Sequence, residues 1–116
     1  MMKKLNSKAS IIFLAFSLSG CMASSLESQA PIYSGHSNKS VDATNRCLAP
    51  KWVELRSSAT SIPTESGYKL IASDDIFGAL SIAKIDTNPA GGSDVTVYAV
   101  ARGFNDHWAT AARSCI

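Results

Sequence analysis

The sequence predicts a small α+β domain: a helix, a three-stranded antiparallel meander and a C-terminal helix, held together by one disulfide. Three observations carry this prediction. Apolar residues recur at helical spacing within residues 41–59 and again near the C-terminus, three strand-like runs lie between these segments, and two cysteines can join the helices. A chain of 116 residues has room for one such domain.

The first predicted helix has Ser40 or Asp42 as its cap. Its apolar face consists of Val41, Leu48, Trp52, Leu55 and Ala59. Pro50 leaves two alternatives, because a proline inside a helix removes a hydrogen bond and causes a kink. Either the helix begins near Ala49, or it begins near Ser40 and bends. The bent helix is favoured because it places Cys47 on the apolar side.

Three strand-like runs follow, at residues 68–73, 79–86 and 94–102. The short connections between them favour antiparallel pairing. The stretch Asn88–Ser93 (NPAGGS) is a strong turn signal, and Gly91 and Gly92 suit the positive φ angles of a hairpin. A phosphate-binding loop is disfavoured, because these glycines precede a strand and do not open a helix.

The last helix is predicted to begin at Asn105, with Asp106 in its first turn. Trp108, Ala112 and Cys115 then fall on one face. The first 20 residues have the features of an export leader, and disulfides form in the compartments to which such leaders direct a protein. We therefore expect Cys47 and Cys115 to form a disulfide that clamps both helices over the sheet. Two free thiols are the alternative.

The first 20 residues have the features of a secretory signal peptide. Lys3, Lys4 and Lys8 precede an apolar run at residues 11–18, which is too short to span a bilayer. The sequence Leu18-Ser19-Gly20-Cys21 then resembles the lipobox of bacterial lipoproteins. This resemblance implies cleavage before Cys21 and attachment of lipid, including palmitate-type acyl chains, to that cysteine. An ordinary secretory leader is the alternative.

The resemblance also implies a location. Met22 is not aspartate, which in lipoproteins of the enteric type implies transport to the outer membrane, facing the periplasm. The inner membrane and the cell surface are the alternatives. Residues 21–39 are predicted to be the lipidated N-terminus and a flexible tether, because they are rich in Ser and lack periodicity. The globular domain is predicted at residues 40–116, and it resembles the small lipoproteins of Gram-negative bacteria.

Charge and composition limit the classes of partner and of functional site that the chain can have. After residue 20 the chain has eight Lys and Arg against nine Asp and Glu, a net charge of −1, so nucleic acid is excluded as a partner. The motifs of a metal or cofactor site do not occur. Catalysis by His107 with a serine is weighed against a solvated histidine at a helix start, and the latter is favoured. The aspartates Asp74, Asp75, Asp86 and Asp94 are interpreted as polar turn residues.

The third predicted strand suggests a binding face. If helices cover Val95 and Val97, the opposite face carries Thr96, Tyr98, Val100 and Arg102. Trp52 and Trp108 are expected in the core. The sequence therefore predicts a non-enzymatic accessory or interaction module of the cell envelope, bound to membrane lipid through Cys21 and contacting an envelope protein. A small envelope hydrolase using His107 and an inhibitor or exclusion lipoprotein are the alternatives.

Overall fold

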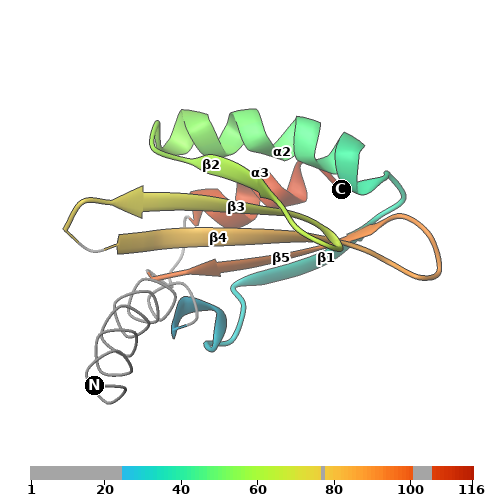
Figure 1. Ribbon diagram of the computed structural model, residues 1–116, viewed down its shortest axis with the longest axis horizontal. Helices are drawn as coiled ribbons and strands as arrows, with labels where there is room; N and C mark the ends of the chain where they lie inside the picture. The colour runs from blue at the N-terminus through green and yellow to red at the C-terminus, as the bar shows by residue number, and fades with distance from the viewer. Residues whose placement is uncertain (1–24, 77, 101–105) are drawn as a thin grey trace, which may run out of the picture.

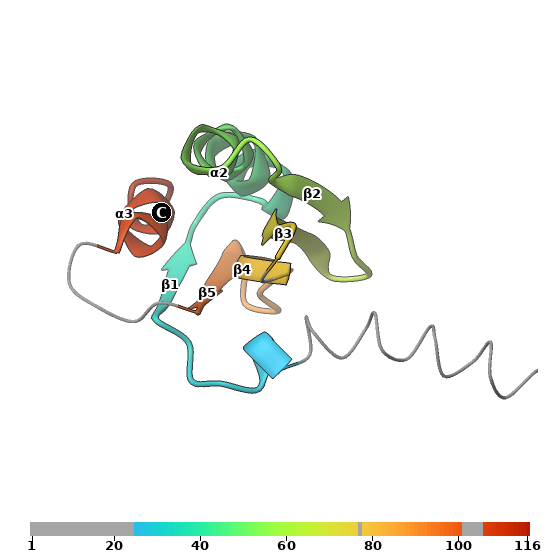
Figure 2. The same ribbon diagram turned by 90° about the vertical axis from the view of Figure 1, so that its left-hand side faces the viewer.

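The computed structural model describes residues 25–76, 78–100 and 106–116 (Figure 1). Residues 25–27 form a helical turn. The elements that follow are β1 (Tyr33–Ser37), α2 (Val41–Leu55), β2 (Thr60–Pro63), β3 (Gly67–Asp74), β4 (Gly78–Thr87), β5 (Ser93–Ala99) and α3 (His107–Arg113). The strands form one sheet, and α2 and α3 lie together over one of its faces (Figures 1 and 2).

The sheet has five antiparallel strands in the order β1-β5-β4-β3-β2. The prediction of a three-stranded meander is therefore wrong. Strands β3, β4 and β5 arise from the three runs that the sequence marked, and β2 and β1 extend the sheet at its two edges. These edge strands were missed because they are short and lack alternating apolar residues, the signal from which a half-buried strand is predicted.

Strand β1 lies within the range predicted to be a flexible tether. Tyr33 pairs with Val97 and Ser37 with Ser93, more than 50 residues away in the sequence. Ile32 extends this contact, since its amide donates to the Val97 carbonyl at 2.8 Å. Residues 33–37 thus belong to the folded domain. The sequence did not indicate this strand, because its side chains are mostly polar and the pairing is made by backbone groups that every residue type except proline offers in full.

Helix α2 begins as predicted after Ser40, whose hydroxyl accepts a hydrogen bond from the Ala43 amide at 3.1 Å. The helix continues through Pro50, so the alternative of a start near Ala49 is wrong. Pro50 lies on the exposed side, where water can satisfy the carbonyl that loses its helical donor. The helix ends at Leu55, and the predicted last member of its face, Ala59, is buried just beyond it.

Helix α3 begins after Asp106, whose carboxylate accepts from the amides of Trp108 at 2.9 Å and Ala109 at 3.2 Å. The sequence prediction gave the cap to Asn105, which lies outside the described residues. Arg113 at the end of α3 stacks over the ring of Tyr33, 5.3 Å from its centroid. This contact holds α3 above β1.

The main core lies between the sheet and the two helices, on what we call the helix face. Leu48 and Trp52 of α2 pack there with Leu70, Ile85, Val95 and Val97 of the sheet, all at most 1% exposed. The predicted disulfide between Cys47 and Cys115 is confirmed, with Cα atoms 5.7 Å apart. It joins α2 to the residues that follow α3.

The β4–β5 hairpin confirms the turn predicted from NPAGGS. Gly91 and Gly92 have φ angles of +113° and +74°, which side-chain-bearing residues rarely adopt. The Asn88 side-chain oxygen accepts from the Ala90 amide at 2.8 Å, and the Asn88 carbonyl accepts from the Gly91 amide at 2.9 Å. Gly92 is also required for space, because a Cβ atom there would lie 2.1 Å from the carbonyl oxygen of Ser37.

The opposite face of the sheet carries a second, smaller buried region. We call it the lysine face, because Lys69 of β3 and Lys84 of β4 are paired across it. Ile82 on this face is completely buried, although it does not belong to the core cluster of the helix face. The helical turn at residues 25–27 lies on this side of the sheet, away from α2 and α3 (Figure 2), and its Leu26 is 3% exposed.

Candidate functional site

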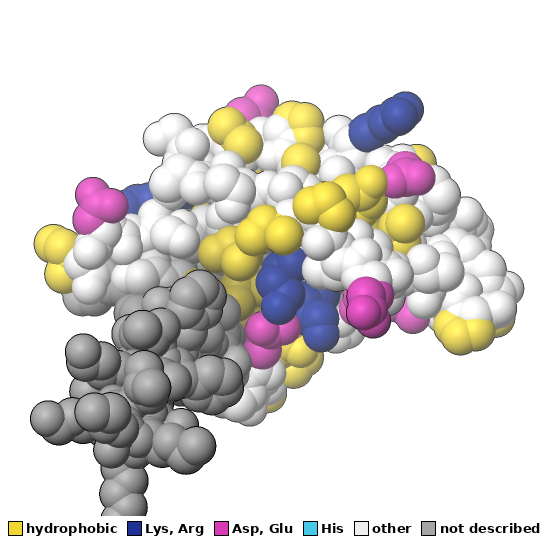
Figure 3. All heavy atoms as spheres, in the orientation of Figure 1, with side chains coloured by type: hydrophobic (Ala, Val, Ile, Leu, Met, Phe, Trp, Pro, Cys, Tyr) yellow, Lys and Arg dark blue, Asp and Glu magenta, His cyan; other side chains and the backbone are white. Residues whose placement is uncertain are grey.

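A cluster of three charged side chains lies on the lysine face. The carboxylate of Glu27 accepts from the Lys69 ammonium at 3.0 Å and lies 3.7 Å from that of Lys84. The three side chains are 21–37% exposed, so the cluster is partly shielded from water. Figure 3 shows basic side chains on this side of the molecule, bordered by acidic and hydrophobic ones. Glu27 therefore pairs with both ammonium groups, and the carboxylates of Glu65 and Asp86 lie in the same lining as the two lysines.

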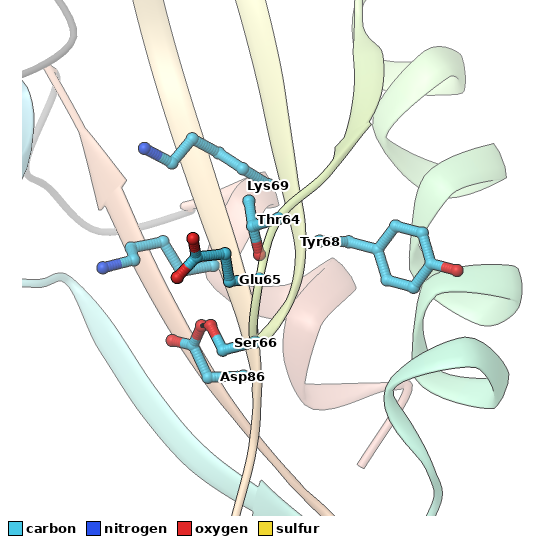
Figure 4. Close-up of a pocket in the computed structure, with 7 residues that line it drawn as sticks. Thr64, Glu65, Ser66, Tyr68, Lys69 and Asp86 are labelled. Carbon is cyan, nitrogen blue, oxygen red and sulfur yellow. Dashed lines mark hydrogen bonds between the residues drawn. The ribbon is translucent and has the colours of Figure 1, made fainter.

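A shallow hollow of about 300 Å³ adjoins this cluster. Its lining is Thr64, Glu65, Ser66, Tyr68, Lys69, Lys84 and Asp86. The Ser66 hydroxyl donates to the Asp86 carboxylate at 2.6 Å. Figure 4 shows Glu65, Ser66 and Asp86 on one side of the strands and the Tyr68 ring pointing away from them, toward α2. The hollow therefore offers carboxylates, hydroxyls and ammonium groups, but no aromatic surface for a ring-shaped ligand.

Tyr68 serves the packing of α2 and not the hollow. Its hydroxyl donates a hydrogen bond to the Asp42 carboxylate in the first turn of α2. This bond stabilises the neutral phenol and raises the pKa of Tyr68 above its ordinary value, with smaller contributions from burial and from the Asp42 charge. Tyr68 thereby links β3 to the start of the helix.

A hydrogen-bonded pair of His36 and Asp94, which the sequence analysis did not identify, lies at the other end of the lysine face. His36 Nδ1 lies 2.9 Å from an oxygen of Asp94, and the Asn88 amide donates to both Asp94 oxygens at 3.0 and 3.1 Å. The hydrogen bond with His36 and then that from Asn88 lower the pKa of the Asp94 carboxyl. His36 was assigned to the tether, and no local signal marks a partner 58 residues away.

His36 and Asp94 are the residue types that accompany the serine in a Ser-His-Asp triad, but this pair is exposed to solvent. The side chains of His36 and Asp94 are 47% and 46% exposed. Among the described residues, no hydrogen bond joins His36 to a serine. A pairing of this kind needs a nucleophile within hydrogen-bond reach to perform acyl transfer. The contact therefore acts as a link between β1 and β5.

A second shallow hollow, of about 390 Å³, lies where α2 ends. Arg56 and Asp74 form an ion pair in it, and Ser58 donates to the carbonyl of Ser73 at 2.6 Å. Asp74 and Asp75 were interpreted from the sequence as polar turn residues, and both lie at the end of β3 or just after it. The ion pair joins the end of the helix to this end of the sheet.

The predicted binding face is only partly present as an open surface. Thr96 and Tyr98 lie on the lysine face as expected, and both are half-buried. Val100 follows β5 and is 54% exposed. Arg102 lies outside the described residues. The N-terminal residues that were expected to be a tether occupy part of this side of the sheet, so the face is less open than predicted.

The other predicted candidates do not assemble into a site. His107 is the first residue of α3 and is exposed, as expected for a histidine at a helix start. Trp52 is completely buried in the core, as predicted, and its ring contacts that of Trp108. Within the described part of the chain, no three His, Cys, Asp or Glu side chains are grouped so that they could hold a metal ion.

Two further observations concern the membrane and known proteins. Cys21, the predicted lipidation site, lies outside the described residues. In residues 25–76, 78–100 and 106–116, none of the helices has the length and apolar character needed to cross a bilayer. No protein-family model, no curated protein and no solved structure matches the chain significantly.

Proposed function

We propose that the mature protein is a lipid-anchored, non-enzymatic interaction module of the bacterial cell envelope. It is held by Cys21 at the outer membrane, faces the periplasm and contacts another envelope protein. The observation that carries this proposal is the sequence Leu18-Ser19-Gly20-Cys21 placed directly after a basic start and a short apolar run. Acyl chains bury many methylene groups, each contributing about 0.8 kcal/mol, and several chains together give stable anchoring.

The disulfide supports export. Disulfides such as Cys47–Cys115 persist in oxidising compartments like the periplasm and are rare in the reducing cytosol. The mature domain is also small, and domains of this size commonly need a covalent link because their cores are limited. An exported position for the domain therefore explains why a chain of this length carries the bond.

The character of the surface supports binding over catalysis. The two hollows are shallow and polar, and basic groups in each form ion pairs, Arg56 with Asp74 and Lys69 with Glu27. Enzyme sites typically contain a group whose proton affinity is strongly shifted within a cleft. Tyr68 and Asp94, whose pKa values are shifted, instead bridge structural elements.

The anchor is tested by expressing the chain with its own leader and feeding the cells an alkyne analogue of palmitate. We expect label on the parent protein, a mature N-terminus at Cys21 by mass spectrometry and recovery in the outer-membrane fraction. The Cys21→Ser variant should carry no label and should remain uncleaved. Cleavage at another residue, or an unlabelled Cys21 in the parent, contradicts the proposal.

The partner is tested by placing a photocrosslinking amino acid at Tyr98 on the lysine face or at Val53 on the exposed side of α2. One dominant protein adduct at either position supports an interaction module, and its position identifies the contacting face. Absence of protein adducts at both positions, with the protein folded and lipidated, contradicts this part of the proposal.

A further inference from the structure

The chain that leads to the predicted anchor is fixed to one particular face of the domain. We call residues 25–32 the N-terminal segment. Leu26 is 3% exposed, Glu27 pairs with Lys69 and Lys84, and Ile32 is hydrogen-bonded to β5. In Figure 2 the start of this segment lies on the opposite side of the sheet from α2 and α3. The described part of the chain therefore begins on the lysine face.

The distance from this face to the anchor is short. Four residue steps separate Cys21 from Ser25, and a fully extended chain covers at most about 3.3–3.6 Å per residue, or about 14 Å in all. A free tether over residues 21–39 would instead allow the domain to turn in any direction. Because Leu26 is buried, the connection between Cys21 and the folded domain is a few residues long and not the 18 residues of the predicted tether. We call this connection the short link.

The side chains around this attachment point suit a headgroup layer. Ile62 of β2, which pairs with Lys69, is 46% exposed and provides an apolar side chain on the same face. Lys69 and Lys84 present ammonium groups there, beside the carboxylates of Glu27, Glu65 and Asp86. Ammonium groups bind phosphate, which every phospholipid headgroup presents. Asp94 lies farther along the strands, toward the β4–β5 turn.

We propose that the lysine face is an interaction surface for the phospholipid bilayer and is held against the headgroups by the short link. This inference rests on the proposed lipidation of Cys21 and deepens it. Lys69 and Lys84 contact lipid phosphates, Ile62 lies toward the interface, and α2 points away from the membrane. A protein partner then meets α2 more readily than it meets Tyr98.

Ile62 and Val53 form a matched pair for testing this orientation. Ile62 is 46% exposed on the lysine face, and Val53 is 47% exposed on α2. Ile62→Cys and Val53→Cys variants of the full lipidated chain are labelled with a fluorophore and reconstituted into phosphatidylethanolamine and phosphatidylglycerol vesicles. Lipids with a nitroxide in the headgroup are included as quenchers, and thiol titration shows that Cys47 and Cys115 remain paired.

We expect the label at position 62 to be quenched several-fold more strongly than that at position 53. A flexible insert of about ten Gly and Ser residues between Ser24 and Ser25 should remove the difference, since the link then reaches much farther. Leu26→Ala combined with Glu27→Gln should reduce it, because the N-terminal segment is then released. Lys69→Gln with Lys84→Gln should also reduce the difference, because the two ammonium groups then no longer contact lipid phosphates.

Equal quenching at the two positions in vesicle-bound, lipidated protein overturns the orientation and leaves the lipid anchor intact. Stronger quenching at Val53 overturns it as well. A chain that carries no lipid and does not float with the vesicles overturns the proposed anchor and this inference together. The two failures are therefore distinguished by whether the protein is bound to the vesicles.

Discussion

The indole rings of Trp52 and Trp108 lie with their centroids 4.8 Å apart and their planes tilted by 50°, directly joining α2 to the start of α3. The Cys47–Cys115 disulfide makes a second connection between the same two parts of the chain. Aromatic pairs in such tilted arrangements contribute beyond the area that they bury. The two contacts together hold the helices as one layer over the sheet.

Trp52 should be the most sensitive core position. Trp52→Ala is expected to lower the free energy of unfolding by about 3–5 kcal/mol, because it leaves a large cavity beside Trp108. Trp52→Phe should lower the free energy of unfolding clearly less. The buried indole N–H has no hydrogen-bond partner among the described residues, so its removal breaks no hydrogen bond. Urea unfolding followed by circular dichroism measures both. The neighbouring Val53→Ala is the control, and an equal loss in that variant would contradict the assignment of the core.

The disulfide should provide much of the stability. It closes a loop with a sequence separation of 68, for which the chain-entropy model gives about 4 kcal/mol. Cys115→Ser is expected to lower the melting temperature strongly, and reductant should do the same to the parent protein. The Cys47→Ser, Cys115→Ser double variant should not respond to reductant. Equal melting temperatures for the oxidised parent and these variants would show that the bond contributes nothing.

Asp94 should make stability depend on pH in the acid range. Its folded pKa lies below its unfolded value, which is about 3.9. The carboxylate therefore stabilises the fold above the unfolded pKa, and this contribution is lost as pH falls through the lower folded pKa. Asp94→Asn should show a shallower fall in melting temperature on acidification. Asp75→Asn, at an exposed position, is the control, and the same change of slope in both variants would remove Asp94 as the cause.

The two turn glycines should differ in their tolerance of alanine. Both have positive φ angles, so each alanine variant carries backbone strain of about 1–3 kcal/mol. At Gly91 the space for a methyl group is open, whereas at Gly92 the carbonyl of Ser37 lies 2.1 Å from the Cβ position. Gly92→Ala should therefore lower the melting temperature more than Gly91→Ala and should disturb the β1–β5 pairing. Hydrogen exchange of the β1 amides measures that effect, and equal exchange in both variants would contradict it.

Local patterns predicted most of the individual elements. The cap at Ser40, the apolar face with Leu48 and Trp52, and the alternation along β5 depend on residues close in sequence, and each appears in the structure. The turn at Gly91 and Gly92 was predictable because positive φ angles favour glycine wherever they occur. The Cys47–Cys115 pairing followed from cysteine number and the expected compartment.

The size of the sheet and the surface of the lysine face were not predictable in this way. Strand β1 is defined by backbone hydrogen bonds to β5, and the contact of His36 with Asp94 spans 58 residues. Glu27 meets Lys69 only because the N-terminal segment folds back over the sheet. Side-chain periodicity carries no information about such partners, since it reports only which residues of one segment share a face.

The sequence by itself predicted an export leader and a lipid site at Cys21, and it determined α2, α3 and the three central strands. Each of these depends on the chemistry of neighbouring residues. Only the tertiary structure decided that Leu26 is buried and that residues 33–37 complete the sheet. The physical reason is that edge pairing and the burial of Leu26 are interactions between segments far apart in the chain. They also decide how far the folded domain can lie from the proposed anchor.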